Sequence, residues 1–122
     1  MLTTLVMLVT IFFAGMGLLA LAAPERITVT FGTLTLTPAG RNEVRAVYGG
    51  FGLAMAAMIF VATRDPALAR GIYLSVAAAL GGMAAGRIVS AAIERPRSFY
   101  PSWFYCALET VMALTLLAAA RG

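Results

Sequence analysis

The chain has 122 residues, of which 61% are hydrophobic and 11% are charged, whereas about 25% of the residues in a typical soluble domain are charged. This composition and a mean hydropathy of +0.93 exclude an ordinary soluble domain and indicate an integral membrane protein. The formal net charge is +4, but the nine basic residues are all arginines and form no cluster, so we expect no nucleic-acid partner. Cys106 is the only cysteine and histidine is absent, so we expect no internal disulfide, no metal and no cofactor.

Four apolar segments divide the sequence, at about residues 2–23, 44–63, 67–92 and 103–120. Each is close to the ~20 residues that a helix needs to cross ~30 Å of hydrocarbon. A membrane barrel would need many alternating segments of about ten residues, so the pattern predicts an all-α, four-transmembrane-helix bundle. We expect one integral membrane domain over residues 1–122. The first segment lacks the basic flank of a signal peptide and is therefore predicted to be a membrane helix.

A change of period separates the first two spans. Hydrophobic residues and threonines alternate from about residue 27 to residue 37, with Gly32 in the middle. This two-residue period predicts a short β-hairpin between spans one and two, with Gly32 at its turn. Two interpretations of the hairpin stay open: an ordered connector without function, or a lid over a site.

Polar residues mark the predicted helix starts. Asn42 is the expected N-cap of the second span, and Glu43 then lies in the first turn, where the helix dipole favours a carboxylate. Arg45 follows in the same turn, where a cation opposes the dipole, so its position predicts an interaction partner. Asp65 followed by Pro66 predicts the N-cap and first residue of the third span.

Glycines at helical spacing predict close contacts between helices. Gly49 and Gly52 share a helical face with Arg45 in the second span. Gly82 and Gly86 are four residues apart in the third span, a spacing that suits tight packing in membranes.

Two charged residues lie inside the predicted spans. Arg87 is eight residues, or about 12 Å along a helix, inside the boundary residue Arg95. Glu109 is six residues, or about 9 Å, beyond Trp103. A charge at such depth costs about 2.5–3.5 kcal/mol on insertion scales, so we expect Glu109 to be paired, neutralised or facing water. Arg87 has two open interpretations, snorkelling to the boundary or pairing inside the bundle.

Successive spans run in opposite directions, so the start of span two, the end of span three and the start of span four lie on one side of the membrane. The polar residues of these three regions are therefore predicted to converge on one site, with the hairpin as a cover. This candidate ligand-binding site comprises Asn42, Glu43, Arg45, Tyr48, Arg87, Ser90, Tyr105 and Glu109.

Two segments resemble a known family. Residues 42–50 (NEVRAVYGG) and 86–90 (GRIVS) are similar to the Asn-Glu-x-Arg-x-x-Tyr-Gly-Gly signature and the later Gly-Arg-x-x-Ser of domain-of-unknown-function family 4345. The resemblance extends over nearly the whole chain, although residues 94–96 (ERP) lack the glycine of the family's later acidic-glycine-proline segment. It implies a small bacterial four-span protein of the inner membrane, and it supplies no activity.

Three functions stay open from the sequence. In the first, Arg45 and Arg87 hold the head group of a lipid-like or anionic amphipathic ligand, which makes a membrane lipid the expected partner. The second is a structural or accessory subunit, with a homo-oligomer or a membrane complex as the partner. The third and least favoured is a membrane enzyme that uses Glu43 or Glu109 as a general acid or base, and no catalytic residue is assigned.

Overall fold

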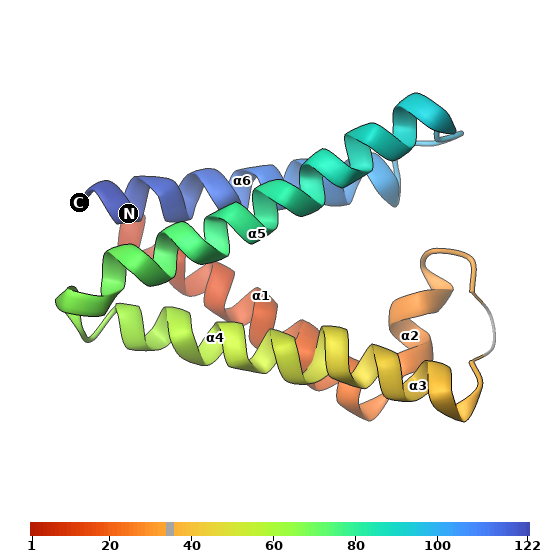
Figure 1. The fold of residues 1–122 in the computed structure, drawn as a ribbon, viewed down its shortest axis with the longest axis horizontal. Helices are drawn as coiled ribbons and strands as arrows, with labels where there is room; N and C mark the ends of the chain where they lie inside the picture. Colours follow the sequence, from red (N-terminus) through yellow and green to blue (C-terminus); the bar gives the residue numbers. More distant parts are fainter. Residues whose placement is uncertain (34–35) are drawn as a thin grey trace. The chain divides into compact units, whose positions relative to one another are not determined.

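The computed structural model describes residues 1–33 and 36–122, and every regular element among them is helical (Figure 1). Four helical stretches are long and apolar enough to cross a membrane, as the sequence predicts. They are Leu2–Ala22, Pro38–Ala62, Pro66–Ile93 and Ser102–Arg121. The individual elements are α1 (Leu2–Ala22), α2 (Pro24–Val29), α3 (Pro38–Val44), η1 (Arg45–Gly50), α4 (Phe51–Ala62), α5 (Pro66–Ile93) and α6 (Ser102–Arg121).

The β-hairpin predicted at about residues 27–37 is wrong. Residues 27–29 belong to helix α2, and strands are absent from the part of the chain that the structure describes. Gly32 does lie in a turn, with a φ of +90° that suits glycine, but the turn follows a helix. Residues 34 and 35, which fall in the predicted second strand, lie outside the described residues.

Local helix signals explain why this segment is not a strand. Pro24 occupies the first turn of α2, where its missing N–H costs nothing, and Glu25 lies in the same turn. The hydroxyl of Thr28 donates to the carbonyl of Glu25 at 3.3 Å, so this threonine bonds within its own helix. An isolated two-stranded hairpin is marginal in water, and strand propensity depends on neighbours to pack against, so the alternating pattern is overridden.

The second stretch begins at Pro38, upstream of the predicted boundary at residue 44. Thr37 is its N-cap, because its side-chain oxygen accepts a hydrogen bond from the N–H of Gly40 at 3.0 Å. Asn42 and Glu43 therefore lie inside α3, and the predicted N-cap role of Asn42 is wrong. Thr37 supplies the cap, and the ring of Pro38 fixes φ at a value that suits a helix. The helix therefore starts at Pro38 and not at residue 44.

The connector between α2 and α3 is held by one arginine. Arg41 donates from Nη1 to the carbonyl of Leu36 at 2.8 Å and lies 3.6 Å from the carboxylate of Glu25. Both charged side chains are substantially exposed, so the ion pair adds little stability by itself. Its effect is to tie the start of α3 to α2.

The chain comprises two compact units, one of residues Met7–Val61 and the other of Met1–Val6 with Ala62–Gly122. The expectation of a single integral membrane domain over residues 1–122 stays a prediction. In the first of these units, small residues bring α1 against η1 and α4. A Cβ on Gly17 would lie 2.9 Å from the carbonyl oxygen of Gly49, and one on Gly52 would lie 3.2 Å from that of Phe13. Backbones approach this closely only where side chains are absent.

The second unit is built mainly from the antiparallel pair of α5 and α6, which lie side by side (Figure 1). Helix α5 starts as predicted, because the Asp65 carboxylate accepts from the N–H of Ala67 at 2.9 Å and Pro66 is the first helical residue. Each of the two helices has five buried residues. These are Tyr73, Val76, Ala77, Leu80 and Ala84 from α5, and Cys106, Glu109, Met112, Ala113 and Leu116 from α6.

Candidate functional site: a buried arginine–glutamate pair and its pocket

Arg87 of α5 and Glu109 of α6 form an ion pair within two of the helices that are long and apolar enough to cross a membrane. Nε of Arg87 donates to Oε2 of Glu109 at 2.8 Å, and Nη2 donates to Oε1 at 2.7 Å. The glutamate side chain is 4% exposed and the arginine side chain 24%. This two-point geometry matches the planar guanidinium to the planar carboxylate, which makes the contact strong and directional.

The packing of α5 on α6 places this pair. One turn before Arg87, the carbonyl of Ala84 lies 3.7 Å from Sγ of Cys106, which donates to it. Cys106 precedes Glu109 by three residues, so both point from the same face of α6 toward α5. The Tyr105 ring lies on the guanidinium of Arg87, with Cζ 5.5 Å from the ring centroid. An aromatic face at this distance stabilises the cation further.

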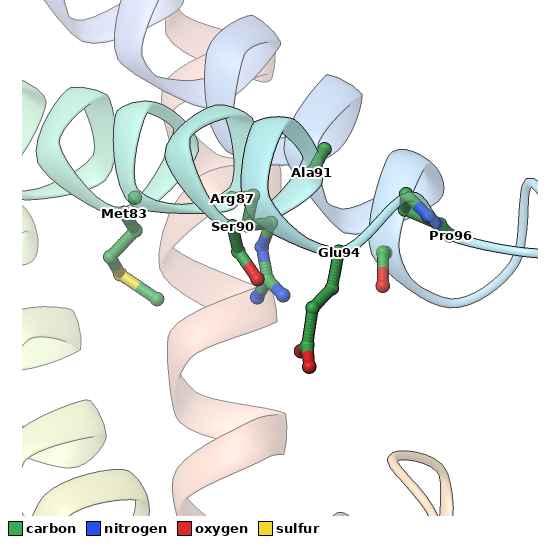
Figure 2. A pocket seen from close by; sticks show the side chains of 8 residues that line it. Met83, Arg87, Ser90, Ala91, Glu94 and Pro96 are labelled. Carbon is green, nitrogen blue, oxygen red and sulfur yellow. The ribbon is translucent and has the colours of Figure 1, made fainter.

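A pocket of about 480 Å³ opens beside Arg87. Its lining runs from the last turns of α5, through the loop that follows, to the first residue of α6. Figure 2 shows Arg87, Ser90 and Glu94 projecting from α5 to the same side, with Met83 at the deeper end and Pro96 at the loop. The lining residues are Met83, Gly86, Arg87, Ser90, Ala91, Glu94, Pro96 and Ser102. The volume falls within the ~300–1,000 Å³ typical of small-molecule sites.

Arg45 has its own partner in the other unit. Its Nε donates to the carbonyl oxygen of Leu21 at 3.0 Å. Leu21 is in the last turn of α1, where carbonyls lack intrahelical partners and the helix dipole favours a cation. Arg45 therefore has a partner, as the sequence predicts, but that partner is the end of a helix and not a carboxylate.

The remaining residues of the candidate site divide between the two units. Ser90 lines the pocket and Tyr105 covers Arg87, so these two lie with the ion pair. Asn42 and Glu43 are exposed in α3, and Tyr48 is half-buried in η1. The convergence of this second group with Arg87 stays a prediction.

The four glycines that the sequence predicts to pack helices have different surroundings. Gly49 and Gly52 face α1, where added Cβ atoms would meet Leu21 at 2.8 Å and the Phe13 carbonyl at 3.2 Å. A Cβ on Gly82 or Gly86 would meet no atom within 4 Å among the described residues. Gly86 instead lines the pocket, where the missing side chain leaves room next to Arg87.

Several lining residues are absent from the site that the sequence predicts. Glu94 is seven residues after Arg87 and Ser90 is three residues after it, so all three share one face of α5. That helical spacing is a signal that could have added Glu94 to the site. Ser102 and Pro96 are brought in only by the path of the loop between α5 and α6. The residues missed are Met83, Ala91, Glu94, Pro96 and Ser102.

The ion pair limits the chemistry of the site. Both oxygens of Glu109 accept hydrogen bonds from Arg87, so the carboxylate is engaged in holding the guanidinium and is not presented as a general acid or base. Among the described residues, no three acidic or cysteine side chains gather in a way that could hold a metal ion. The arrangement offers a positioned cation, two hydroxyl groups and an exposed carboxylate around a pocket, which suits binding.

Comparison with known proteins adds one finding. The model of the family described as Domain of unknown function (DUF4345) matches residues 1–120. No curated protein and no solved structure matches the chain. The family match covers both signature segments and all of the four candidate spans except Arg121, as the sequence resemblance implies. The chain therefore belongs to the DUF4345 family.

Proposed function

We propose that this protein binds a lipid-like amphipathic molecule in the pocket beside Arg87, as a multi-pass protein of a bacterial inner membrane. The observation that carries the proposal is the position of Arg87, which is held by a buried carboxylate while it lines a pocket at one end of two spanning helices. An arginine fixed in this way presents its charge at low entropic cost, because its side chain is already ordered.

The distribution of lining residues supports an amphipathic ligand. Met83 and Gly86 lie on the deeper side of the pocket, further inside the span than Arg87. Glu94, Pro96 and Ser102 lie at the boundary, at and beyond the end of α5. The pocket is therefore apolar toward the membrane interior and polar toward its surface, which is the polarity of a lipid at that depth.

Native mass spectrometry of the detergent-extracted protein tests this proposal. Dioctanoyl phosphatidylethanolamine and dioctanoyl phosphatidylglycerol are suitable short-chain probes. The test variant is the double substitution Arg87→Gln with Glu109→Gln, which keeps two hydrogen-bonding side chains and leaves no buried charge unpaired. Loss of a charge-assisted hydrogen bond of about 1.5–3 kcal/mol predicts at least a tenfold weaker affinity for the better-bound probe.

Arg121→Gln is the matched control, because it also removes one arginine but at the far end of α6. It should bind the probe as the wild type does. Equal probe binding by the double variant and the wild type would overturn the proposal, as would the absence of any bound probe in the wild type.

A structural or accessory role is the second candidate, and one observation favours it. The pair between Arg87 and Glu109 is complete without a ligand and joins α5 to α6. In this role the pair fixes the register of the two helices, and the partner is a second copy or another membrane protein. The role predicts that the double variant loses an oligomer or complex by native mass spectrometry while no lipid probe binds either form.

A further inference from the structure

The pocket has two charged poles of opposite sign. Arg87 and Glu94 both line it, and both project to the same side of α5 together with Ser90 (Figure 2). They are seven residues apart in α5 and its C-cap, or about 10 Å along the helix axis. A ligand in the pocket therefore meets a cation at the deeper pole and a carboxylate at the shallower one.

The charge balance does not favour a purely anionic ligand. Glu109 compensates the charge of Arg87 through two hydrogen bonds, so Arg87, Glu109 and Glu94 together carry one net negative charge. A head group with only negative charge would be attracted by Arg87 and repelled by Glu94. A head group with only positive charge would be attracted by Glu94 and repelled by Arg87.

The ends of the two helices also contribute to the field at the shallower side of the pocket. Glu94 is the C-cap of α5, at the end where the helix dipole carries about half a negative charge and favours cations. Ser102 is the first residue of α6, at the end that carries about half a positive charge and favours anions. Both residues lie at the shallower side of the pocket, so the dipole of α5 adds to the negative charge of Glu94, whereas the N-terminal end of α6 offers a second place that favours the anionic part of a ligand.

We infer that the pocket beside Arg87 selects a zwitterionic head group, in which a phosphate lies next to an ammonium, as in an ethanolamine phospholipid. This inference rests on the proposed function and names its ligand class. The phosphate contacts Arg87, with the hydroxyls of Ser90 and Ser102 as further donors. The ammonium contacts Glu94 at the end of α5, and the acyl chains pass Met83 toward the membrane interior.

Selectivity between head groups tests the inference. Dioctanoyl phosphatidylethanolamine is compared with dioctanoyl phosphatidylglycerol, which carries the phosphate but no ammonium, by native mass spectrometry titration. The wild type should bind the ethanolamine lipid at least about fivefold more tightly, which corresponds to about 1 kcal/mol. Glu94→Gln should bring the two affinities together by weakening the ethanolamine lipid alone. Glu25→Gln removes an acid outside the pocket and should keep the preference.

The outcomes separate this inference from the proposed function. Equal binding of the two lipids by the wild type, with both lost in the Arg87→Gln and Glu109→Gln double variant, overturns the zwitterion selectivity and leaves the lipid site standing. A preference for ethanolamine that survives Glu94→Gln also overturns it. If neither lipid binds, both proposals fail. Competition by soluble glycerophosphoethanolamine, which has no acyl chains, shows whether the head group alone accounts for the preference.

Discussion

Arg87 and Glu109 meet through two parallel hydrogen bonds, 2.8 and 2.7 Å long, that join α5 to α6 within two candidate membrane spans. Each residue alone would place a charge at a depth that is costly in a membrane. Together they form a pair without net charge, in which both oxygens of Glu109 accept hydrogen bonds from Nε and Nη2 of Arg87. Lysine at position 87 would offer a point charge in place of the planar guanidinium, so it would not reproduce both bonds.

Glu109→Ala is expected to destabilise the protein strongly. The substitution leaves the guanidinium of Arg87 without its carboxylate, and breaking a buried pair in this way costs about 3–5 kcal/mol. Because Arg87 is 24% exposed, we expect the lower end of that range. The free energy of unfolding in detergent measures the effect, and labelling of the buried thiol of Cys106 reports unfolding.

A double-mutant cycle with Arg87→Gln separates the pair from its surroundings. Glu109→Gln alone should lower the free energy of unfolding. The double variant that also carries Arg87→Gln should lower it less, because no charge is left unpaired. If the double variant loses the sum of the unfolding free energies that the two single variants lose, the two residues do not stabilise each other.

Gly17→Ala is expected to destabilise the unit of residues Met7–Val61, whereas Gly15→Ala is not. The new Cβ at position 17 would lie 2.9 Å from the carbonyl of Gly49 and from Leu53, so α1 must move away from η1 and α4. The new Cβ at position 15 meets nothing within 4 Å. Overpacking of this kind costs about 1–3 kcal/mol. Thermal unfolding of the two variants side by side measures the difference, and equal midpoints would contradict the close contact.

Arg45→Gln is expected to loosen the end of α1. Without the donor at Nε, the carbonyl of Leu21 loses its 3.0 Å hydrogen bond, and the negative end of the helix loses a cation. Because Arg45 is exposed, the loss in stability should be about 1 kcal/mol. Faster hydrogen exchange confined to the last turn of α1 is the expected signature. Unchanged exchange there would mean that the hydrogen bond does not hold α1.

Asp65→Ala is expected to destabilise the start of α5 by about 1 kcal/mol. The carboxylate now accepts a 2.9 Å hydrogen bond from the N–H of Ala67, and alanine has no acceptor to replace it. Asp65→Asn keeps an acceptor and should retain most of the stability. The unfolding free energies of the two variants provide the comparison, and equal losses would show that the carboxylate acts through its charge alone.

The errors in the sequence-based predictions share a physical cause. Threonines alternating with apolar residues suit a strand, yet Pro24 and Glu25 start a helix there, and a strand pair has no sheet to join. Asn42 suits an N-cap, yet Thr37 and Pro38 cap the helix earlier. In both cases two local signals within a few residues favour different structures, and the sequence pattern alone does not show which of them is stronger.

The sequence by itself determined the class of the protein, the number of spanning segments and the charged residues that need partners. These properties follow from hydropathy and from the cost of unsatisfied groups in lipid, which depend on composition along one segment at a time. Only the tertiary structure decided which partners are used. Arg87 reaches Glu109 across 22 residues and Arg45 reaches a carbonyl across 24, and such pairings depend on how helix faces pack. The same packing brings Ser102 and Glu94 to the pocket, because a loop path and a helix register are properties of the folded chain.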